Sequence, residues 1–258
     1  MRLSPMPRLG AALTPGRRRW PLPSKAGILR PMANVVPLSL SVHELATLRR
    51  VAAPVVPSFD SRFDREVEVR LLNQPWFERH RLLEVASPSP LPARRAHFAV
   101  GDHATLCLSG ATPGKHGHVQ LDRLLDADPP APIDTAQRAL DYAVFVDFVT
   151  CRSELGELIL SRFEDIPLFP QLDDIESALM SGLQEDLDGA IRPPDVQPAE
   201  GGWVVEKWVL TAGALLRREC YVGTDGRFRT EETVIDESMP VPHGRVWGFS
   251  NGRLVPVG

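Results

Sequence analysis

The segment from Trp203 to Ile235 constrains the fold of this chain more than any other. It reads WVVEKWVLTAGALLRRECYVGTDGRFRTEETVI, three runs rich in strand-forming residues with two short glycine-containing interruptions. Such runs at short intervals are typical of consecutive antiparallel strands. The second interruption contains Asp225-Gly226, residues that tolerate the positive φ of a tight reversal. The segment therefore predicts a three-stranded antiparallel meander.

The segment 134–150 is the clearest helix in the sequence. Asp134 and Gln137 stand at the positions of a capping box, in which each side chain bonds the other residue's backbone N–H. The residues that follow are apolar on nearly all sides of a helix, and such a helix is buried on most sides. We therefore expect helix 134–150 to be the central element, packed on the concave face of the meander, with Phe145 and Phe148 both buried.

The other elements are shorter. The start of 64–85 alternates like a strand, while the residues after Pro75 fit a helix, and the sequence leaves both open. Strands separated by helices, followed by consecutive antiparallel strands, indicate an α+β fold. Further predicted elements are a helix over 41–52 with a capping box at Ser41 and Glu44, a hairpin over 95–109, a short helix near 121–125, a strand over 156–163, a surface helix over 174–183 and a hairpin that turns at 250–252.

We expect residues 36–258 to form a single α+β domain, with a curled antiparallel sheet packed on a long central helix. This outline is similar to the cystatin-like and NTF2-like cone folds, and the likeness rests on the order of elements alone. Such folds serve many functions, so the architecture by itself implies none.

Residues 1–35 contain six prolines, seven basic residues and no acidic residue. A segment with so little periodic apolar surface cannot offset the entropy lost on ordering, so we expect a disordered basic tail that is dispensable for stability. Three interpretations stay open for it. Translation starts at Met32, or the segment is a transit peptide, or it is a basic arm for anionic surfaces. We favour the first, or a tail without function.

Charge and composition limit the classes of partner and the cell compartment that we expect for this chain. Residues 36–258 carry 22 basic and 33 acidic residues, a net charge of −11. Phosphate contacts need a positive surface, so we expect no nucleic-acid binding, and no apolar run is long enough to predict a membrane helix. Cys107, Cys151 and Cys220 are widely spaced and odd in number, which favours buried free thiols in the cytoplasm. The excess of arginine over lysine favours a bacterial source.

His116 and His118 are the one pair at metal-ligand spacing. The segment 110–118, GATPGKHGH, resembles the start of the first cupin motif, in which two histidines on a strand face one metal. Asp122 stands where that family has a glutamate, and Trp247 stands where a second motif would supply another histidine. Two imidazoles without a third ligand bind a metal weakly, so we expect no metal and no cofactor.

Cys107 is the one nucleophile with histidines nearby in the predicted hairpin, at His97 and His103. A reactive thiol needs an electropositive and accessible setting, and an apolar strand is the opposite. We therefore expect Cys107 to be a buried structural cysteine.

Asp141, Tyr142 and Asp147 are the polar residues of the predicted central helix. The two carboxylates are six residues apart, about 120° from sharing a face, and cannot act as one pair. A charge on a largely buried helix needs a partner, and Arg217 or Arg218 is the expected structural one.

No motif typical of serine hydrolases, phosphate loops, dinucleotide sites or zinc proteases is present, and catalytic residues stay unknown. We expect a non-enzymatic binding or assembly module whose partner is another protein or a second copy. The recognition surface would be a sheet face that carries Trp203 or Trp208, which are five apart and so point to opposite faces. The alternative is a small-molecule binder or enzyme with a pocket between helix 134–150 and the C-terminal sheet.

Overall fold

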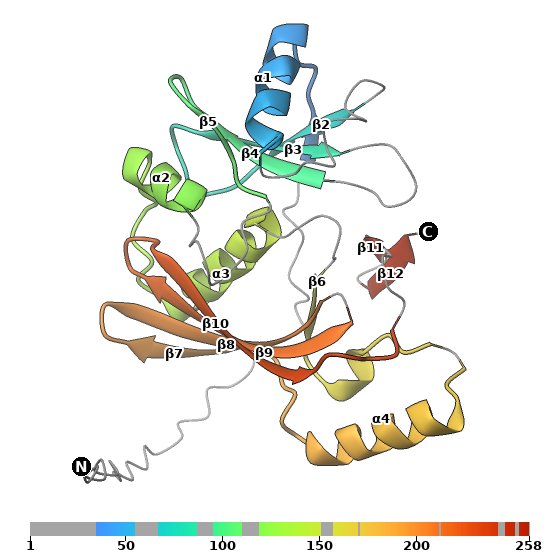
Figure 1. Cartoon of the computed structure of the whole chain (residues 1–258). Helices are drawn as coiled ribbons and strands as arrows, with labels where there is room; N and C mark the ends of the chain where they lie inside the picture. The colour runs from blue at the N-terminus through green and yellow to red at the C-terminus, as the bar shows by residue number, and fades with distance from the viewer. Residues whose placement is uncertain are drawn as a thin grey trace, which may run out of the picture. The chain divides into compact units, whose positions relative to one another are not determined.

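The structure is a computed structural model that describes residues 35–54, 67–86, 95–109, 119–150, 157–169, 171–211, 213–241, 246–250 and 253–257. Helices and antiparallel strands occur together along the described chain (Figure 1), which confirms the α+β class. Residues 1–34 of the expected tail and the His116 and His118 pair lie outside the described residues. None of the helices in the described ranges is long and apolar enough to cross a membrane.

The first sheet has five strands in the order β1-β2-β3-β4-β5. The expectation of one curled sheet is therefore too simple, because the first five strands of the chain pair with one another and not with the meander. The prediction of a helix after Pro75 is also wrong, because this segment contains a turn and then the strand β3. The Gln74 side chain instead accepts hydrogen bonds from the N–H groups of Trp76 (2.6 Å) and Phe77 (2.9 Å), which fixes a turn between two strands. The strands are β1 (Val35–Pro37), β2 (Glu68–Leu72), β3 (Arg81–Ala86), β4 (Arg95–Val100) and β5 (Thr105–Cys107).

The second sheet contains the predicted meander. Its order is β10-β9-β8-β6, and β7 pairs with the other part of β8. Both meander turns need positive φ, which is +82° at Gly213 and +85° at Gly226. A separate pair of antiparallel strands confirms the predicted C-terminal hairpin, with Ser250 opposite Arg253, and residues 251 and 252 of its turn lie outside the described residues. The strands are β6 (Glu157–Leu160), β7 (Asp195–Ala199), β8 (Gly202–Thr211), β9 (Ala214–Gly223), β10 (Phe228–Asp236), β11 (Val246–Ser250) and β12 (Arg253–Val257).

The four α-helices are α1 (Val42–Ala52), α2 (Val119–Ala127), α3 (Ala136–Thr150) and α4 (Asp174–Asp186), and a 3-10 turn covers Phe163–Asp165. The capping box of α1 is present as predicted. The predicted box of α3 is wrong, because the Thr135 hydroxyl accepts the hydrogen bond from the Arg138 N–H at 3.2 Å. The Gln137 amide instead donates to the Asp141 carboxylate at 2.8 Å. The hydroxyl of Thr135 thus takes the capping place that the sequence assigned to Asp134.

Three apolar cores hold these elements. Residues of α1 pack with β2, β3, β4 and β5 in one core, and a second core joins α2 and α3 with residues of both large sheets. The third core lies on the opposite face of the second sheet and includes Met180 of α4. Trp203 belongs to the α3 side of that sheet and Trp208 to the α4 side, so the two tryptophans do point to opposite faces.

The helix α3 is buried on most of its circumference but not on all of it. Phe145 is 4% exposed and lies about 6 Å, centroid to centroid, from the rings of Trp76, Phe77 and Tyr142. Phe148 is 37% exposed, so the expectation that both phenylalanines are buried is wrong. Asp141 is exposed too, and residues seven apart share one face of a helix. That face is the one that the cores do not cover.

Candidate functional site

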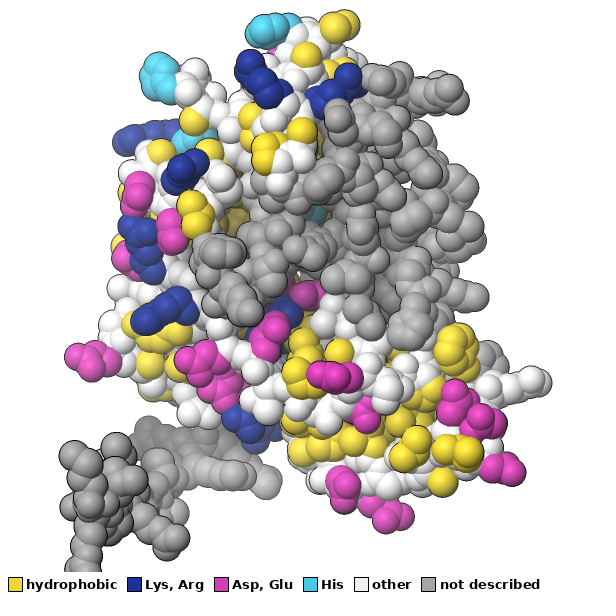
Figure 2. Space-filling model, in the orientation of Figure 1, with side chains coloured by type: hydrophobic (Ala, Val, Ile, Leu, Met, Phe, Trp, Pro, Cys, Tyr) yellow, Lys and Arg dark blue, Asp and Glu magenta, His cyan; other side chains and the backbone are white. Residues whose placement is uncertain are grey.

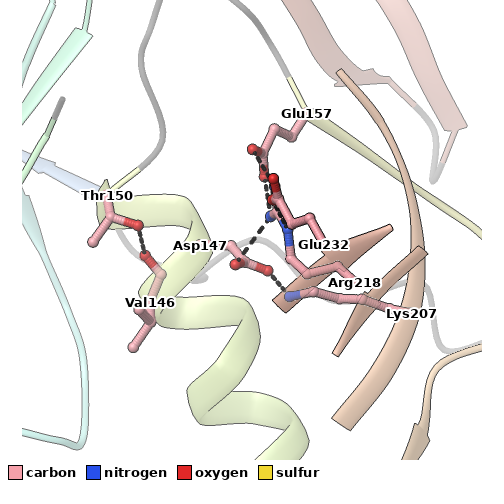
Figure 3. A network of polar contacts seen from close by, with 7 residues as sticks. All are labelled: Val146, Asp147, Thr150, Glu157, Lys207, Arg218 and Glu232. Atoms are coloured by element: carbon pink, nitrogen blue, oxygen red, sulfur yellow. Dashed lines mark hydrogen bonds and ion pairs between the residues drawn. The ribbon is translucent and has the colours of Figure 1, made fainter. Parts of the chain in front are cut away.

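Asp147 lies in a network of charged side chains between α3 and the second sheet (Figure 3). The strand register places Lys207 of β8 opposite Arg218 of β9, and Arg218 opposite Glu232 of β10. Alternation along each strand puts this row on the same face as Val205, which packs in the core with α3. Val205 and Cys220 lie on one side of this row and Val209 and Leu216 on the other, so the charged row is set within an apolar face.

The contacts within the network are specific. Asp147 accepts a hydrogen bond from the Lys207 ammonium through Oδ2, and its Oδ1 lies 3.3 Å from Nη1 of Arg218. The Arg218 guanidinium donates to both carboxylate oxygens of Glu157, at 2.8 and 2.9 Å, and to Glu232 at 2.7 Å. A bidentate pair of this kind fixes geometry as well as charge. Of the two partners expected for Asp147, Arg217 and Arg218, it is Arg218 that contacts it.

Burial sets the electrostatics of the two cations. The Lys207 side chain is fully buried, and burial lowers the pKa of its ammonium to about 8. The Asp147 carboxylate in contact with it favours the charged form, so Lys207 is an ammonium at neutral pH. Burial also raises the pKa of the neighbouring Cys220 thiol, and the nearby positive charges of Lys207 and Arg218 oppose that shift.

The arrangement fits a structural role better than a catalytic one. Each described carboxylate of the network contacts Lys207 or Arg218, so none of them is free to act as a general base. No group of three or more His, Cys, Asp and Glu residues in the described ranges has the geometry of a metal site. The network therefore ties α3 to four strands of the sheet, β6, β8, β9 and β10.

Tyr142 and Asp141 do not join Asp147 in one pocket. Tyr142 is fully buried, its hydroxyl donates to the Gly226 carbonyl at 2.9 Å, and its ring packs edge-on against Trp76. Burial raises the pKa of that phenol. Asp141 is exposed at the surface of α3. The three polar residues of the helix, any one of which could have faced a pocket, thus lie in the core, at the surface and in the charged network.

Sequence reasoning missed a buried polar cluster in the first sheet. Glu84 and His97 stand opposite each other on β3 and β4, and Nε2 of His97 lies 3.5 Å from the Glu84 carboxylate. The other ring nitrogen, Nδ1, lies 3.1 Å from the Ser109 hydroxyl. A polar residue within each of two paired, otherwise apolar strands is the signal that would have found it.

These residue types match a hydrolase triad, but their contacts do not. Ser109 is 1% exposed, so a substrate has no access to its hydroxyl in this conformation. That hydroxyl accepts from the His97 backbone N–H at 2.8 Å and donates to the Val149 carbonyl at 3.2 Å. Its proton is therefore directed at a backbone oxygen rather than at the imidazole. The cluster joins the first sheet to the end of α3.

Cys107 is buried, as expected, and its thiol lies 3.8 Å from the Ser109 carbonyl. Burial raises the pKa of this thiol to about 11. His103 is exposed near the β4–β5 turn, and Nδ1 of His97 contacts Ser109. No thiolate–imidazole pair is formed among these residues. Cys220 is a second buried free thiol, and Cys151 lies outside the described residues.

His80 and Asp128 form a further buried pair at the turn between β2 and β3. The Asp128 carboxylate accepts hydrogen bonds from the N–H groups of Arg79 (2.8 Å) and His80 (3.0 Å), and it lies 3.1 Å from Nδ1 of His80. These contacts fix the turn to the end of α2.

An open hollow of about 630 Å³ lies beside the turn between β2 and β3. It is lined by residues 36, 71–74, 77, 78 and 80–82, none of which belongs to α3.

The sheet does not present a tryptophan for recognition. Trp208 is 5% exposed, and the Trp203 indole N–H donates to the Ile133 carbonyl at 3.0 Å. Trp208 is therefore packed in a core, and Trp203 is partly exposed and held against Ile133, so neither ring projects freely from the sheet.

The outward side of α4 is different. We name it the α4 face and define it by Ile175, Ala178, Leu179 and Gly182, which follow one another at helical spacing and are all exposed. Met180 is the one buried residue of the helix. Figure 2 shows apolar side chains gathered over the region of α4, with carboxylates around them.

Comparison of the chain with protein-family models, with curated protein sequences and with solved structures gives no match in any of the three.

Proposed function

We propose that the protein is a non-enzymatic binding module that recognises another protein through the α4 face. The observation that carries this proposal is the exposure of Ile175 and Leu179, which are 72% and 61% exposed and lie one turn apart. Single exposed apolar residues are ordinary, but contiguous ones rimmed by polar groups are typical of interaction sites. A partner that covers this face would bury both side chains.

The charge around α4 indicates the class of partner. The chain contains no lysine, arginine or histidine between Arg162 and Arg192 and eight acidic residues. Such a surface repels the phosphates of nucleic acids and of anionic lipid head groups. A positively charged protein surface is the partner that fits both its charge and its apolar stripe.

The alternative is a small-molecule binder or enzyme with a pocket between helix 134–150 and the second sheet. It has weaker support, because Asp141, Tyr142 and Asp147 lie in three different environments. A catalytic pocket needs polar groups that converge on one place. The polar clusters of the core hold one element to another instead.

Two finer points belong to the same proposal. We propose a cone-like architecture similar to the cystatin-like or NTF2-like folds, with α3 as the central helix, and the contacts of α3 with β7, β8 and β9 support it. We also propose a cytoplasmic location, which the two buried free thiols support. A bacterial source stays an expectation from composition.

Site-specific photo-crosslinking tests the binding function. A photoreactive residue at position 179 of the full chain, in the cells that produce it, should give one dominant protein adduct. The same residue at Val42, which is 86% exposed on α1, is the control for adventitious contact. The crosslinked protein, once purified, should bind the chain, and Leu179→Ser should weaken that binding about tenfold or more. Identical adducts at both positions, or unchanged binding by Leu179→Ser, would contradict the proposal.

A further inference from the structure

Resting on the proposed function, we infer that the partner presents a basic amphipathic helix, which packs lengthwise against the α4 face. Three features of α4 support this inference. They are the uncompensated acidic residues around the face, the carboxylates at the C-terminal end of the helix, and the small residues at its centre.

The acidic residues of α4 have no ion-pair partner among the lysines and arginines that the structure describes. The two arginines that flank this acidic part of the sequence are already paired, Arg162 with Asp165 at 3.0 Å and Arg192 with Glu206 at 3.0 Å. No described lysine or arginine forms an ion pair with an acidic residue of α4 itself. The acidic residues between the two arginines are Glu164, Asp165, Asp173, Asp174, Glu176, Glu185, Asp186 and Asp188.

The C-terminal end of α4 has its charges in the unfavourable place. Glu185, Asp186 and Asp188 lie at the end where the helix dipole is negative, and the last turn contains no basic residue. At the other end, Asp173 and Glu176 form a capping box that satisfies the first N–H groups. Cations from a partner would stabilise the C-terminal end, which the chain itself leaves uncompensated. This places the basic residues of the partner near Glu185 and Asp186.

The centre of the α4 face is shaped for close approach of another helix. Ala178 and Gly182 are four residues apart, beside the ridge of Ile175 and Leu179, and side chains this small allow another helix to approach closely. A side chain added at Gly182 would meet no atom within 4 Å, so the fold of this chain does not require the glycine. A glycine inside a helix is unfavourable for the helix, and a partner that packs closely at this point accounts for its presence.

The negative charge of the α4 face favours a basic helix over a second copy of the chain. Two α4 faces packed against each other would bring Glu185 and Asp186 of one copy near the carboxylates of the other. Like charges in such contact oppose association, whereas lysine and arginine side chains add attraction that salt weakens. The α4 face therefore fits a basic helix better than it fits itself.

The probe for the test is an 18-residue helical peptide of leucine, alanine and lysine with its lysines on one face. Its matched control carries glutamate in place of lysine. Both are titrated into the full isotope-labelled chain, and binding is followed by the backbone amide signals. We expect the lysine peptide to shift signals of α4 and to bind about tenfold less tightly at high salt than at low salt. We expect the glutamate peptide not to bind.

Three variants separate helix docking from plain charge attraction. Leu179→Ser removes part of the ridge, and Gly182→Leu places a large side chain where the peptide would approach. Each should weaken binding of the lysine peptide about tenfold or more without changing the charge. Glu185→Gln/Asp186→Asn should weaken it and reduce its salt dependence. Equal binding of the peptide to wild type and to the first two variants would overturn the inference.

The outcomes also distinguish this inference from the proposed function. If a crosslinked partner depends on Leu179 but the lysine peptide does not bind, the basic helix is wrong and the binding function stands. If the chain itself forms a dimer that Leu179→Ser abolishes, the occupant is a second copy and the inference is overturned. If neither a crosslinked partner nor the peptide depends on Leu179, both proposals are wrong.

Discussion

Asp147 of α3 and Lys207 of β8 form an ion pair in which the lysine side chain has no exposed surface. Removal of one partner of a buried pair leaves an uncompensated charge, which costs about 3–5 kcal/mol. We therefore expect Asp147→Ala to lower the free energy of unfolding by about that amount, measured by urea denaturation. Asp141→Ala on the exposed face of the same helix is the control and should change it by about 0.5 kcal/mol or less.

The double variant Asp147→Ala/Lys207→Met decides whether the unpaired ammonium is the cause. Replacement of both charges by apolar groups is often close to neutral, so the double variant should recover most of the loss. A double variant as unstable as Asp147→Ala alone would show that the Asp147–Arg218 contact, at 3.3 Å, matters more than the lysine pair.

The two phenylalanines of α3 provide a second test of the packing. Phe145 is buried among three aromatic rings, so Phe145→Ala should cost about 3–5 kcal/mol. Phe148 is partly exposed, although its ring lies 4.6 Å from that of His97, and Phe148→Ala should cost about 1 kcal/mol. Equal losses in thermal or urea unfolding would mean that α3 does not sit in the core as described.

The strands and helices of this chain could be predicted from short patterns, but the environments of single residues could not. The meander was predictable because three strand-like runs and two glycine turns lie within Trp203–Ile235. The prediction of a helix after Pro75 was wrong because these residues form β3, which pairs with β4. Periodicity within one segment does not reveal such a contact. Tertiary pairing overrides local pattern in such short segments.

In the candidate sites, too, the residue types could be read from the sequence but their environments could not. The sequence identifies Asp141 and Asp147 as equivalent carboxylates on one helix, and only the packing of the sheet makes one exposed and the other paired. The buried cluster of Glu84, His97 and Ser109 joins two strands to the end of α3, so its members are not adjacent in the sequence. Helix 174–183 was predictable, but its outward apolar stripe stands out only when Met180 is seen to face the core.

Tyr142→Phe isolates a single buried hydrogen bond. The hydroxyl donates to the Gly226 carbonyl in the β9–β10 turn, and the phenylalanine ring fills nearly the same space. A buried carbonyl left without its donor costs about 1–3 kcal/mol, so we expect a loss in that range by urea denaturation. Tyr221→Phe, at an exposed hydroxyl that donates to the Glu200 carbonyl, is the matched control and should have a smaller effect.

The buried thiols should be unreactive in the folded protein. In a Cys151→Ser background, a thiol reagent at pH 8 should label Cys107 and Cys220 only at the rate of unfolding, and both at once in urea. Burial raises the pKa of Cys107 from 9.0 to about 11, so the fold favours the neutral thiol. Its contribution to stability is complete below pH 9 and declines as the pH rises towards 11. Wild type should therefore lose stability relative to Cys107→Ala across that interval, and parallel pH profiles would contradict the assignment.

Alanine at two glycine positions should change the free energy of unfolding in opposite directions. Gly182 lies within α4 with open space around it, so Gly182→Ala should raise the free energy of unfolding by about 0.5–1 kcal/mol through helix propensity. Gly226 has a φ of +85°, and a Cβ there would lie 2.7 Å from Cγ of Pro130 and 3.1 Å from the Tyr142 hydroxyl. Gly226→Ala should therefore destabilise the protein by more than 1 kcal/mol, in the range of about 1–3 kcal/mol for a strained backbone. Thermal unfolding of the two variants beside wild type measures both changes in stability.

A Gly182→Ala variant that loses stability would show that the chain itself needs this glycine. That result would remove one of the three supports for a partner helix at the α4 face.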